Sequence, residues 1–269
     1  MLRNATLSDR AGVSAALAPL WDDLYLLIPV YQALVAVLTR YGWWSAAKTK
    51  DRAYVARSDW FWRPVMISYN AAMAVFSLCC AAAMGFVVFV RYEGRWKSPD
   101  CSLISQDAMF QQVVYAFYIS KYVEFADTLF LIVKGKQVSW LHWFHHSGAA
   151  LNMGLLYHCK MEAAFLFVCL NGVIHAFMYS YYAVTLFGVR LPGKSALTSL
   201  QIAQFLTGFF YFYSYPRDVP CFASSAELMV VYLFTWAYVG TVLGFFIHFY
   251  ATNYLLASGG SKAGRAKVE

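Results

Sequence analysis

VMISYNAAMAVFSLCCAAAMGFVVFV, residues 65–90, carries no charged side chain and exceeds the about 20 apolar residues that a helix needs to cross a bilayer. Backbone groups in lipid must satisfy one another, so this stretch predicts a transmembrane helix. Six further apolar segments, separated by short loops with charges or helix breakers, predict an all-α integral membrane protein with seven transmembrane helices. The other predicted spans are residues 24–39, 109–133, 141–157, 163–187, 196–215 and 228–256.

The composition of the whole chain agrees with this class. Its 269 residues are 61% hydrophobic and only 13% charged, whereas soluble domains carry roughly 25% charged residues. No linker or internal repeat divides it. We therefore expect one domain over residues 1–269, made of an N-terminal segment 1–23, a helical bundle 24–256 and a basic tail 257–269. No cleavable signal peptide is visible, so the first span is expected to act as a signal anchor.

The net charge of +7 has a topological explanation. In a soluble protein it would suggest nucleic acid as a partner, but here lysine and arginine gather in the loops of one membrane face, and no nucleic acid is expected. They are more frequent after the first, third, fifth and seventh spans than in the other loops. The positive-inside rule then predicts a lumenal N-terminus and a cytosolic C-terminus.

Charged side chains inside a span are costly and mark functional sites. The third predicted span contains Lys121, Glu124, Asp127 and Thr128. Lys121, Glu124 and Thr128 fall on one helical face. An internal ion pair that orders the bundle would explain Lys121 or Asp127 individually, but not the polar groups that continue on the next three spans.

Three successive spans continue this polar character. The fourth begins with His142, His145 and His146, which share one helical face, and the fifth contains His175. Lipid offers these groups no partner, so they are expected to face a common interior site. The other polar or polarisable members are Asn171, Met178, Tyr179, Tyr182, Thr198, Gln201 and Gln204. The predicted topology places this site in the cytosolic half of the membrane.

Together these residues resemble four motifs of the ELO family of very-long-chain fatty acid elongases, the membrane 3-oxoacyl-CoA synthases. KxxExxDT begins at Lys121, HxxHH at His142, HxxMYxYY at His175 and TxxQxxQ at Thr198, in order on successive spans. The stretch from Leu141 to His146 is similar to the branch that acts on saturated and monounsaturated chains.

The resemblance implies a fold and a reaction. Six of the seven helices would enclose a narrow tunnel, closed toward the lumen and open to the cytosol. Malonyl-CoA and an acyl-CoA would condense with loss of CO2 and CoA to give a 3-oxoacyl-CoA two carbons longer. No cofactor and no metal is expected. Reductases and a dehydratase that complete the cycle are the expected membrane partners, and a homo- or hetero-oligomer is compatible with the sequence.

Residue chemistry suggests roles in this condensation. Neutral imidazole can act as a nucleophile or a base, so His145 is the first candidate for an acyl-imidazole intermediate, with His175 as its partner. A histidine acting only as general base is the competing mechanism. His142 and His146 would orient groups or move protons, and Asp127 or Glu124 would fix a tautomer. The expected substrate-binding donors are Lys121, Asn171, Tyr179, Tyr182, Gln201 and Gln204, with Gln201, Gln204 and Asn171 suited to a thioester or enolate oxygen.

Basic residues at the predicted cytosolic mouth could pair with coenzyme A phosphates. They are Lys134, Lys136, Arg190 and Lys194, and they serve equally well as topology determinants. The tail, with Arg265 and Lys267, resembles a retrieval signal of the endoplasmic reticulum membrane. A lumenal loop pair, Cys101 and Cys221, is expected to form a disulfide, because the lumen is oxidising.

Two other classes are compatible with part of the pattern. Histidine boxes also occur in di-iron desaturases and hydroxylases, but that family uses roughly eight histidines and this chain has six, with His158 and His248 outside the clusters. A seven-helix transporter would also carry intramembrane ion pairs. Inverted repeats or helices broken by glycine and proline would favour a transporter, and neither is visible.

Overall fold

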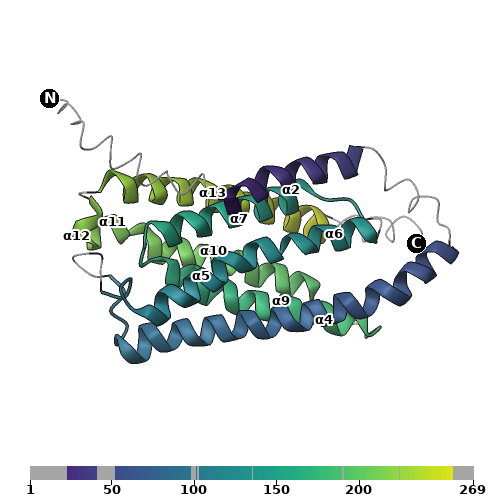
Figure 1. Cartoon of the computed structure of the whole chain (residues 1–269), viewed down its shortest axis with the longest axis horizontal. Coiled ribbons are helices and arrows are strands. Elements are labelled where there is room, and N and C mark those ends of the chain that lie inside the picture. The colour runs from purple at the N-terminus through teal and green to yellow at the C-terminus, as the bar shows by residue number, and fades with distance from the viewer. Residues whose placement is uncertain are drawn as a thin grey trace, which may run out of the picture.

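Each of the seven predicted spans is helical in the computed structural model, which describes residues 23–40, 52–97, 101, 103–134, 136–189, 191–223 and 225–256. The helices run side by side along the long axis of the molecule (Figure 1). The rods are formed by α2 (Asp23–Arg40), α4 (Arg52–Gly85) with η2 (Phe86–Arg91), α5 (Ala108–Val123) with α6 (Phe125–Val133), α7 (Trp140–His158), α8 (Ala164–Leu166) with η3 (Phe167–Asn171) and α9 (Gly172–Leu186), α10 (Lys194–Tyr213), and α13 (Ala226–Tyr250) with η4 (Ala251–Leu256). Two short helices, α11 (Tyr215–Asp218) and α12 (Pro220–Ala223), connect α10 to α13.

Length and hydropathy single out three of these rods as sufficient to cross a membrane, within the described part of the chain. They are Trp60–Arg91, Ala164–Leu186 and Ala226–Leu256, and α2 contributes a shorter apolar helix, Leu24–Thr39. Large apolar side chains also cover the outside of the bundle, for example Trp60 and Phe210, which are 83% and 76% exposed. Such a surface suits a lipid environment.

Helix starts follow local sequence signals. Asp107 caps α5 by accepting hydrogen bonds from the backbone N–H groups of Met109 and Phe110. Ser139 and Ser225 cap α7 and α13 in the same way. Serine or aspartate therefore marks where three of the rods begin.

Packing brings the polar spans together around a common interior. The helix α4 lies along α9, α5 lies along α7, and α13 contacts both α7 and α10. A large buried apolar cluster, including Met84, Ile104, Phe117 and Phe222, fills the end of the bundle near α11 and α12. The polar groups of α5, α7 and α9 lie further along the bundle.

Four spans depart from the uniform α-helices expected from the sequence. The second and seventh end in the π-helical turns η2 and η4, and two others depart from the α-helix in their interior. The third span, predicted as one helix over 109–133, is interrupted at Glu124, where the Asp127 N–H bonds back only three residues, to the Glu124 carbonyl. In the fifth span, η3 is a wide π-helical turn that ends at Asn171. Such turns often occur at functional sites. Both interior departures lie at motif residues.

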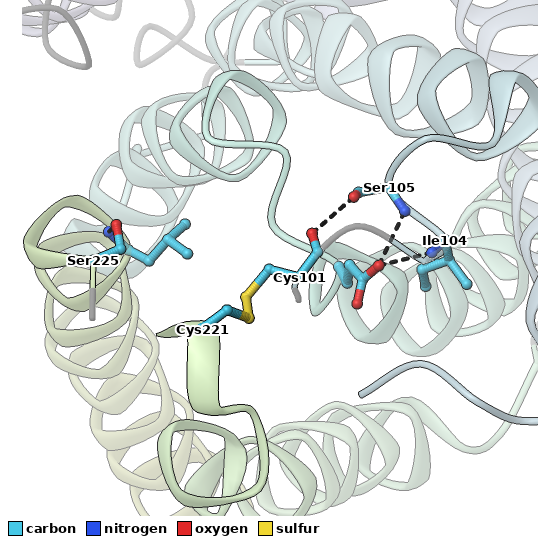
Figure 2. The surroundings of a disulfide bond; sticks show 7 residues. Cys101, Ile104, Ser105, Cys221 and Ser225 are labelled. Carbon is cyan, nitrogen blue, oxygen red and sulfur yellow. Dashed lines mark hydrogen bonds between the residues drawn. A yellow bond between two sulfur atoms is a disulfide. The ribbon is translucent and has the colours of Figure 1, made fainter. Parts of the chain in front are cut away.

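A disulfide joins Cys101 to Cys221, the pair expected from the loop topology, with Cα atoms 5.9 Å apart. It ties the loop before α5 to α12 (Figure 2). The same loop is held by Glu162, whose Oε1 accepts from the N–H groups of Ile104 and Ser105 at 2.7 and 3.2 Å. Glu162 is 1% exposed, so this carboxylate is a buried anchor. The end of the bundle around α12 is thus fixed covalently and by hydrogen bonds.

Candidate functional site

A cavity lies inside the bundle, lined by side chains from α5, α7, α8, η3, α10 and α13. Most of its wall is apolar, as an acyl chain requires. Four of the site residues expected from the sequence line it: Lys121, His145, Asn171 and Gln204. The structure adds Tyr238, Asn152 and Thr235, which the sequence analysis did not single out.

Of the HxxHH histidines, His145 lines the cavity. Tyr238 of α13 donates its hydroxyl proton to the backbone carbonyl of His145 at 2.9 Å, and its oxygen lies 3.3 Å from Nδ1 of the His145 ring. A tyrosine hydroxyl has a single proton. With that proton committed to the carbonyl, the contact with Nδ1 requires Nδ1–H to be the donor. This tautomer leaves the lone pair of His145 on Nε2.

His142 and His146 are held differently. Nε2 of His142 bonds the hydroxyl of Thr128 at 2.8 Å, and that hydroxyl also bonds Tyr31 at 2.7 Å. The rings of His142 and His146 are 4.2 Å apart, and His146 is buried. Neither ring lines the cavity, so these histidines support the wall around His145.

The charged residues of the third span form a buried network. Nζ of Lys121 donates to Oε1 of Glu124 at 2.7 Å and to Oδ1 of Asn171 at 3.1 Å. The same Glu124 oxygen is 3.4 Å from Nδ1 of His175. The Lys121 and Glu124 side chains are 3% and 2% exposed. The network links His175, which does not line the cavity, to Lys121, which does.

Asp127 belongs to a neighbouring pair. Its Oδ2 accepts from the hydroxyl of Tyr179 at 2.8 Å, and Tyr179 is 1% exposed. Neither side chain lines the cavity. Asp127 therefore holds α6 to α9 behind the site.

The glutamines of α10 divide between the cavity and its surroundings. Gln204 lines the cavity, and its Oε1 is buried without a hydrogen-bond partner among the described residues. Nε2 of Gln201 contacts the sulfur of Met178 at 3.6 Å. A cavity-facing amide with free hydrogen-bonding capacity is suited to orient a polar group of a bound ligand.

The remaining predicted binding residues that the structure describes do not line the cavity. Lys136 and Lys194 are exposed at the end of the bundle where α7 and α10 begin, and Lys134 is partly buried there. Arg190 and the tail residues Arg265 and Lys267 fall outside the described residues. Tyr182, expected inside, is 39% exposed, whereas its neighbour Ala183, which follows Tyr179 by four residues, is buried.

This arrangement defines a class of protein: a membrane enzyme with a histidine and amide donors in a largely apolar interior. The chain belongs to the ELO (GNS1/SUR4) family, whose model matches residues 22–262. It is therefore a multi-pass membrane protein and a fatty acid elongase, a 3-oxoacyl-CoA synthase that catalyses the condensation step. The desaturase and transporter hypotheses are set aside on this ground.

Fatty acid elongases of Mus musculus and Homo sapiens are similar in sequence to more than half of this chain. It is 26% identical to very long chain fatty acid elongase 3 of Mus musculus over 248 residues, covering 89% of this chain and 85% of that protein. The human elongase 3 is 28% identical over 199 residues, which cover 71% and 72% of the two chains. The human very long chain fatty acid elongase 6 is 31% identical over 150 residues, or 54% and 57%.

Proposed function

We propose that the cavity holds the acyl chain and that His145 is the nucleophile of the condensation. One observation carries this proposal: His145 lines the cavity, and its contacts with Tyr238 leave the Nε2 lone pair available. Imidazole with a free lone pair can attack a thioester without prior deprotonation.

The reaction proceeds in two halves. In the first, Nε2 attacks the thioester carbonyl of the acyl-CoA, the C–S bond breaks, and CoA leaves as its thiolate. The Nδ1–H stays on the ring, so the acylated His145 is an acyl-imidazolium. In the second, malonyl-CoA loses CO2, and the resulting enolate carbon attacks the acyl carbonyl. The C–N bond to His145 then breaks, which returns the electron pair to the imidazole and yields the 3-oxoacyl-CoA.

Neighbouring groups would stabilise charge in these steps. The Lys121 ammonium and the amides of Asn171 and Gln204 line the same cavity and can donate to a developing oxyanion. Glu124 neutralises Lys121 and lies 3.4 Å from Nδ1 of His175, and this network would connect His175 to the cavity for a proton transfer in the decarboxylation half. His175 acting as general base without a covalent intermediate is the second candidate mechanism.

The membrane arrangement is part of the proposal. Seven spans, with the disulfide end in an oxidising lumen and the opposite end in the cytosol, agree with the basic Lys134, Lys136 and Lys194 at the latter end. Coenzyme A phosphates would bind there. Endoplasmic reticulum residence follows from the same reasoning, with reductases and a dehydratase of the cycle as membrane neighbours.

Saturated and monounsaturated long-chain acyl-CoAs are the proposed substrates, on the resemblance around His142–His146. The test uses purified protein with malonyl-CoA and a length series of acyl-CoAs, analysed by mass spectrometry of the products. Absence of any product two carbons longer would contradict the assignment.

A second experiment separates the two mechanisms. Acyl-CoA alone should release about one CoA per enzyme and leave an acyl adduct on the peptide that contains His145. The adduct should disappear in His145→Ala and persist in His175→Ala, while both variants lose condensation. Full turnover of His145→Ala would overturn the nucleophile assignment. Gln204→Ala should be milder, since one donor is worth on the order of 10²–10³ in rate.

A further inference from the structure

Two polar side chains from different helices bond each other in the wall of the cavity. The hydroxyl of Thr235 on α13 donates to Oδ1 of Asn152 on α7 at 2.8 Å. Asn152 is 2% exposed and Thr235 1% exposed, and both line the cavity. Met153, Phe212 and Trp236 line the same cavity and carry no charge, and the indole N–H of Trp236 is buried without a hydrogen-bond partner among the described residues. Neither residue belongs to the four motifs.

This pair leaves hydrogen-bonding capacity unused. A primary amide has two donors and an acceptor, and Thr235 satisfies only the acceptor. Among the described residues, the amide nitrogen of Asn152 makes no hydrogen bond. If the amide oxygen and nitrogen exchange places, the nitrogen bonds Thr235 and the oxygen is left over instead. In either assignment one polar atom of Asn152 is unpaired beside the cavity.

Helix association explains the hydrogen bond between Thr235 and Asn152 but not the remaining polar atom of the Asn152 amide. Interhelical hydrogen bonds do hold membrane helices together, and the Thr235 contact supplies one. Burying the rest of an amide is unfavourable unless something bonds it. A leucine and valine pair would fill the same wall without that cost. The unused polar atom therefore points to a group carried by the ligand.

The helical register gives the depth of this group. Asn152 follows His145 by seven residues, or two turns of α7, which places it about 10 Å further along the helix. An extended hydrocarbon chain advances about 1.3 Å per carbon, given single bonds of about 1.5 Å. A chain that runs extended along α7, with its carbonyl carbon at His145, thus passes Asn152 about eight carbons later.

We propose that Asn152 and Thr235 form a specificity-determining site for acyl chains that carry a hydroxyl group or a cis double bond near the ninth carbon. This inference rests on the proposed function, because His145 sets the origin of the count. A hydroxyl group can donate to or accept from the free amide atom. A double bond accepts an N–H weakly through its π electrons, so its effect is smaller than that of a hydroxyl. A saturated chain leaves the amide desolvated and unpaired.

The experiment compares three long-chain acyl-CoAs of equal length in competition for the purified full-length enzyme. One is saturated, one has a cis double bond at the ninth carbon, and one has a hydroxyl there. The ratio of kcat/KM should rise in that order. Losing one net hydrogen bond in Thr235→Val or Asn152→Leu should reduce the hydroxyl preference by about three- to tenfold.

Matched variants keep the result interpretable. Thr235→Ser retains the hydroxyl and should retain the preference, even if packing changes. Asn70→Leu removes another buried amide, which donates to the Met66 carbonyl on α4 and does not line the cavity, and it should leave the ratio unchanged. A melting curve in detergent checks that each variant is folded.

The outcomes separate this inference from the proposed function. In one outcome His145→Ala loses all activity, while the wild type and Thr235→Val show the same ratio of kcat/KM between the hydroxylated and the saturated chain. This outcome overturns the specificity site and leaves the catalytic assignment intact. A wild type that prefers the saturated chain overturns it as well. If the wild type shows the preference and the Thr235→Ser and Thr235→Val variants differ as expected, the site is established.

Discussion

Gly148 of α7 lies directly against the ring of Tyr238, so closely that a Cβ atom at this position would overlap the ring. Tyr238 is the residue that contacts Nδ1 of His145. The glycine therefore lets α13 approach α7 and place the tyrosine hydroxyl beside the proposed nucleophile.

Gly148→Ala should reduce condensation strongly, because the Tyr238 ring must move and its hydroxyl leaves His145. Gly244→Ala is the matched control on α13, since no atom beyond the neighbouring residues and the local helix backbone lies within 4 Å of the added methyl. Turnover assays and melting curves on both proteins test this. Equal activity of the two variants would show that the close contact has no catalytic role.

Tyr238→Phe isolates the hydroxyl itself. Removing it should lower kcat by roughly tenfold with little change in KM, since the Nδ1–H tautomer and the orientation of His145 lose one hydrogen bond. The acyl adduct should form more slowly. Tyr232→Phe is the control, because the Tyr232 hydroxyl donates to the Tyr213 carbonyl at the end of α10. This variant should leave adduct formation unaffected.

The Lys121–Glu124 pair should behave as a unit. Removing one buried partner leaves the other uncompensated, so Lys121→Met or Glu124→Gln alone should destabilise the fold by about 3–5 kcal/mol. The double variant should melt at a higher temperature than the less stable single variant, while remaining inactive. Additive losses in the double variant would argue against direct coupling.

The disulfide should contribute stability rather than catalysis. Cys101→Ser with Cys221→Ser should lower the melting temperature, with an upper stabilisation of about 4–5 kcal/mol from the entropy model for so large a loop. Activity of the folded fraction below its melting temperature should persist, because the bond lies at the opposite end from His145. Labelling of both thiols without prior reduction would show that the bond is absent.

The Asp107 cap should make the free energy of unfolding depend on pH in the acid range. Burial raises the pKa of this carboxyl, but hydrogen bonds from Arg91, Phe110 and Met109 outweigh it and lower the pKa overall. The ionised Asp107 therefore contributes its full stabilisation of the folded state above the unfolded-state pKa of about 3.9. This contribution disappears as the pH falls through the lower pKa of the folded state. Asp107→Asn should flatten the acid side of a melting temperature profile between about pH 3 and 7. A profile identical to that of the wild type would contradict this.

The sequence predicted the helices and much of the site because apolar length and intramembrane charge are local signals. It also indicated His145, Lys121, Asn171 and Gln204, which do line the cavity. Tyr238 and Thr235 escaped notice because they stand in a uniformly apolar helix, and only the packing of α13 on α7 gives them partners. The break at Glu124 depends on tertiary contacts in the same way.

The π-helical turn that ends at Asn171 has a consequence for variation in length. A wide turn contains an additional residue compared with an ordinary α-helical turn, so deleting one residue between Phe167 and Asn171 would restore a regular helix. The residues that follow would keep nearly their present orientation relative to α8, because the wide turn already absorbs the extra residue. A one-residue deletion in the regular helix between Gly172 and Tyr179 has no extra residue to remove, so everything after it would rotate by about 100° and Tyr179 would turn away from Asp127. The η3 turn is therefore a place where this span can lose one residue at less cost than in its regular part.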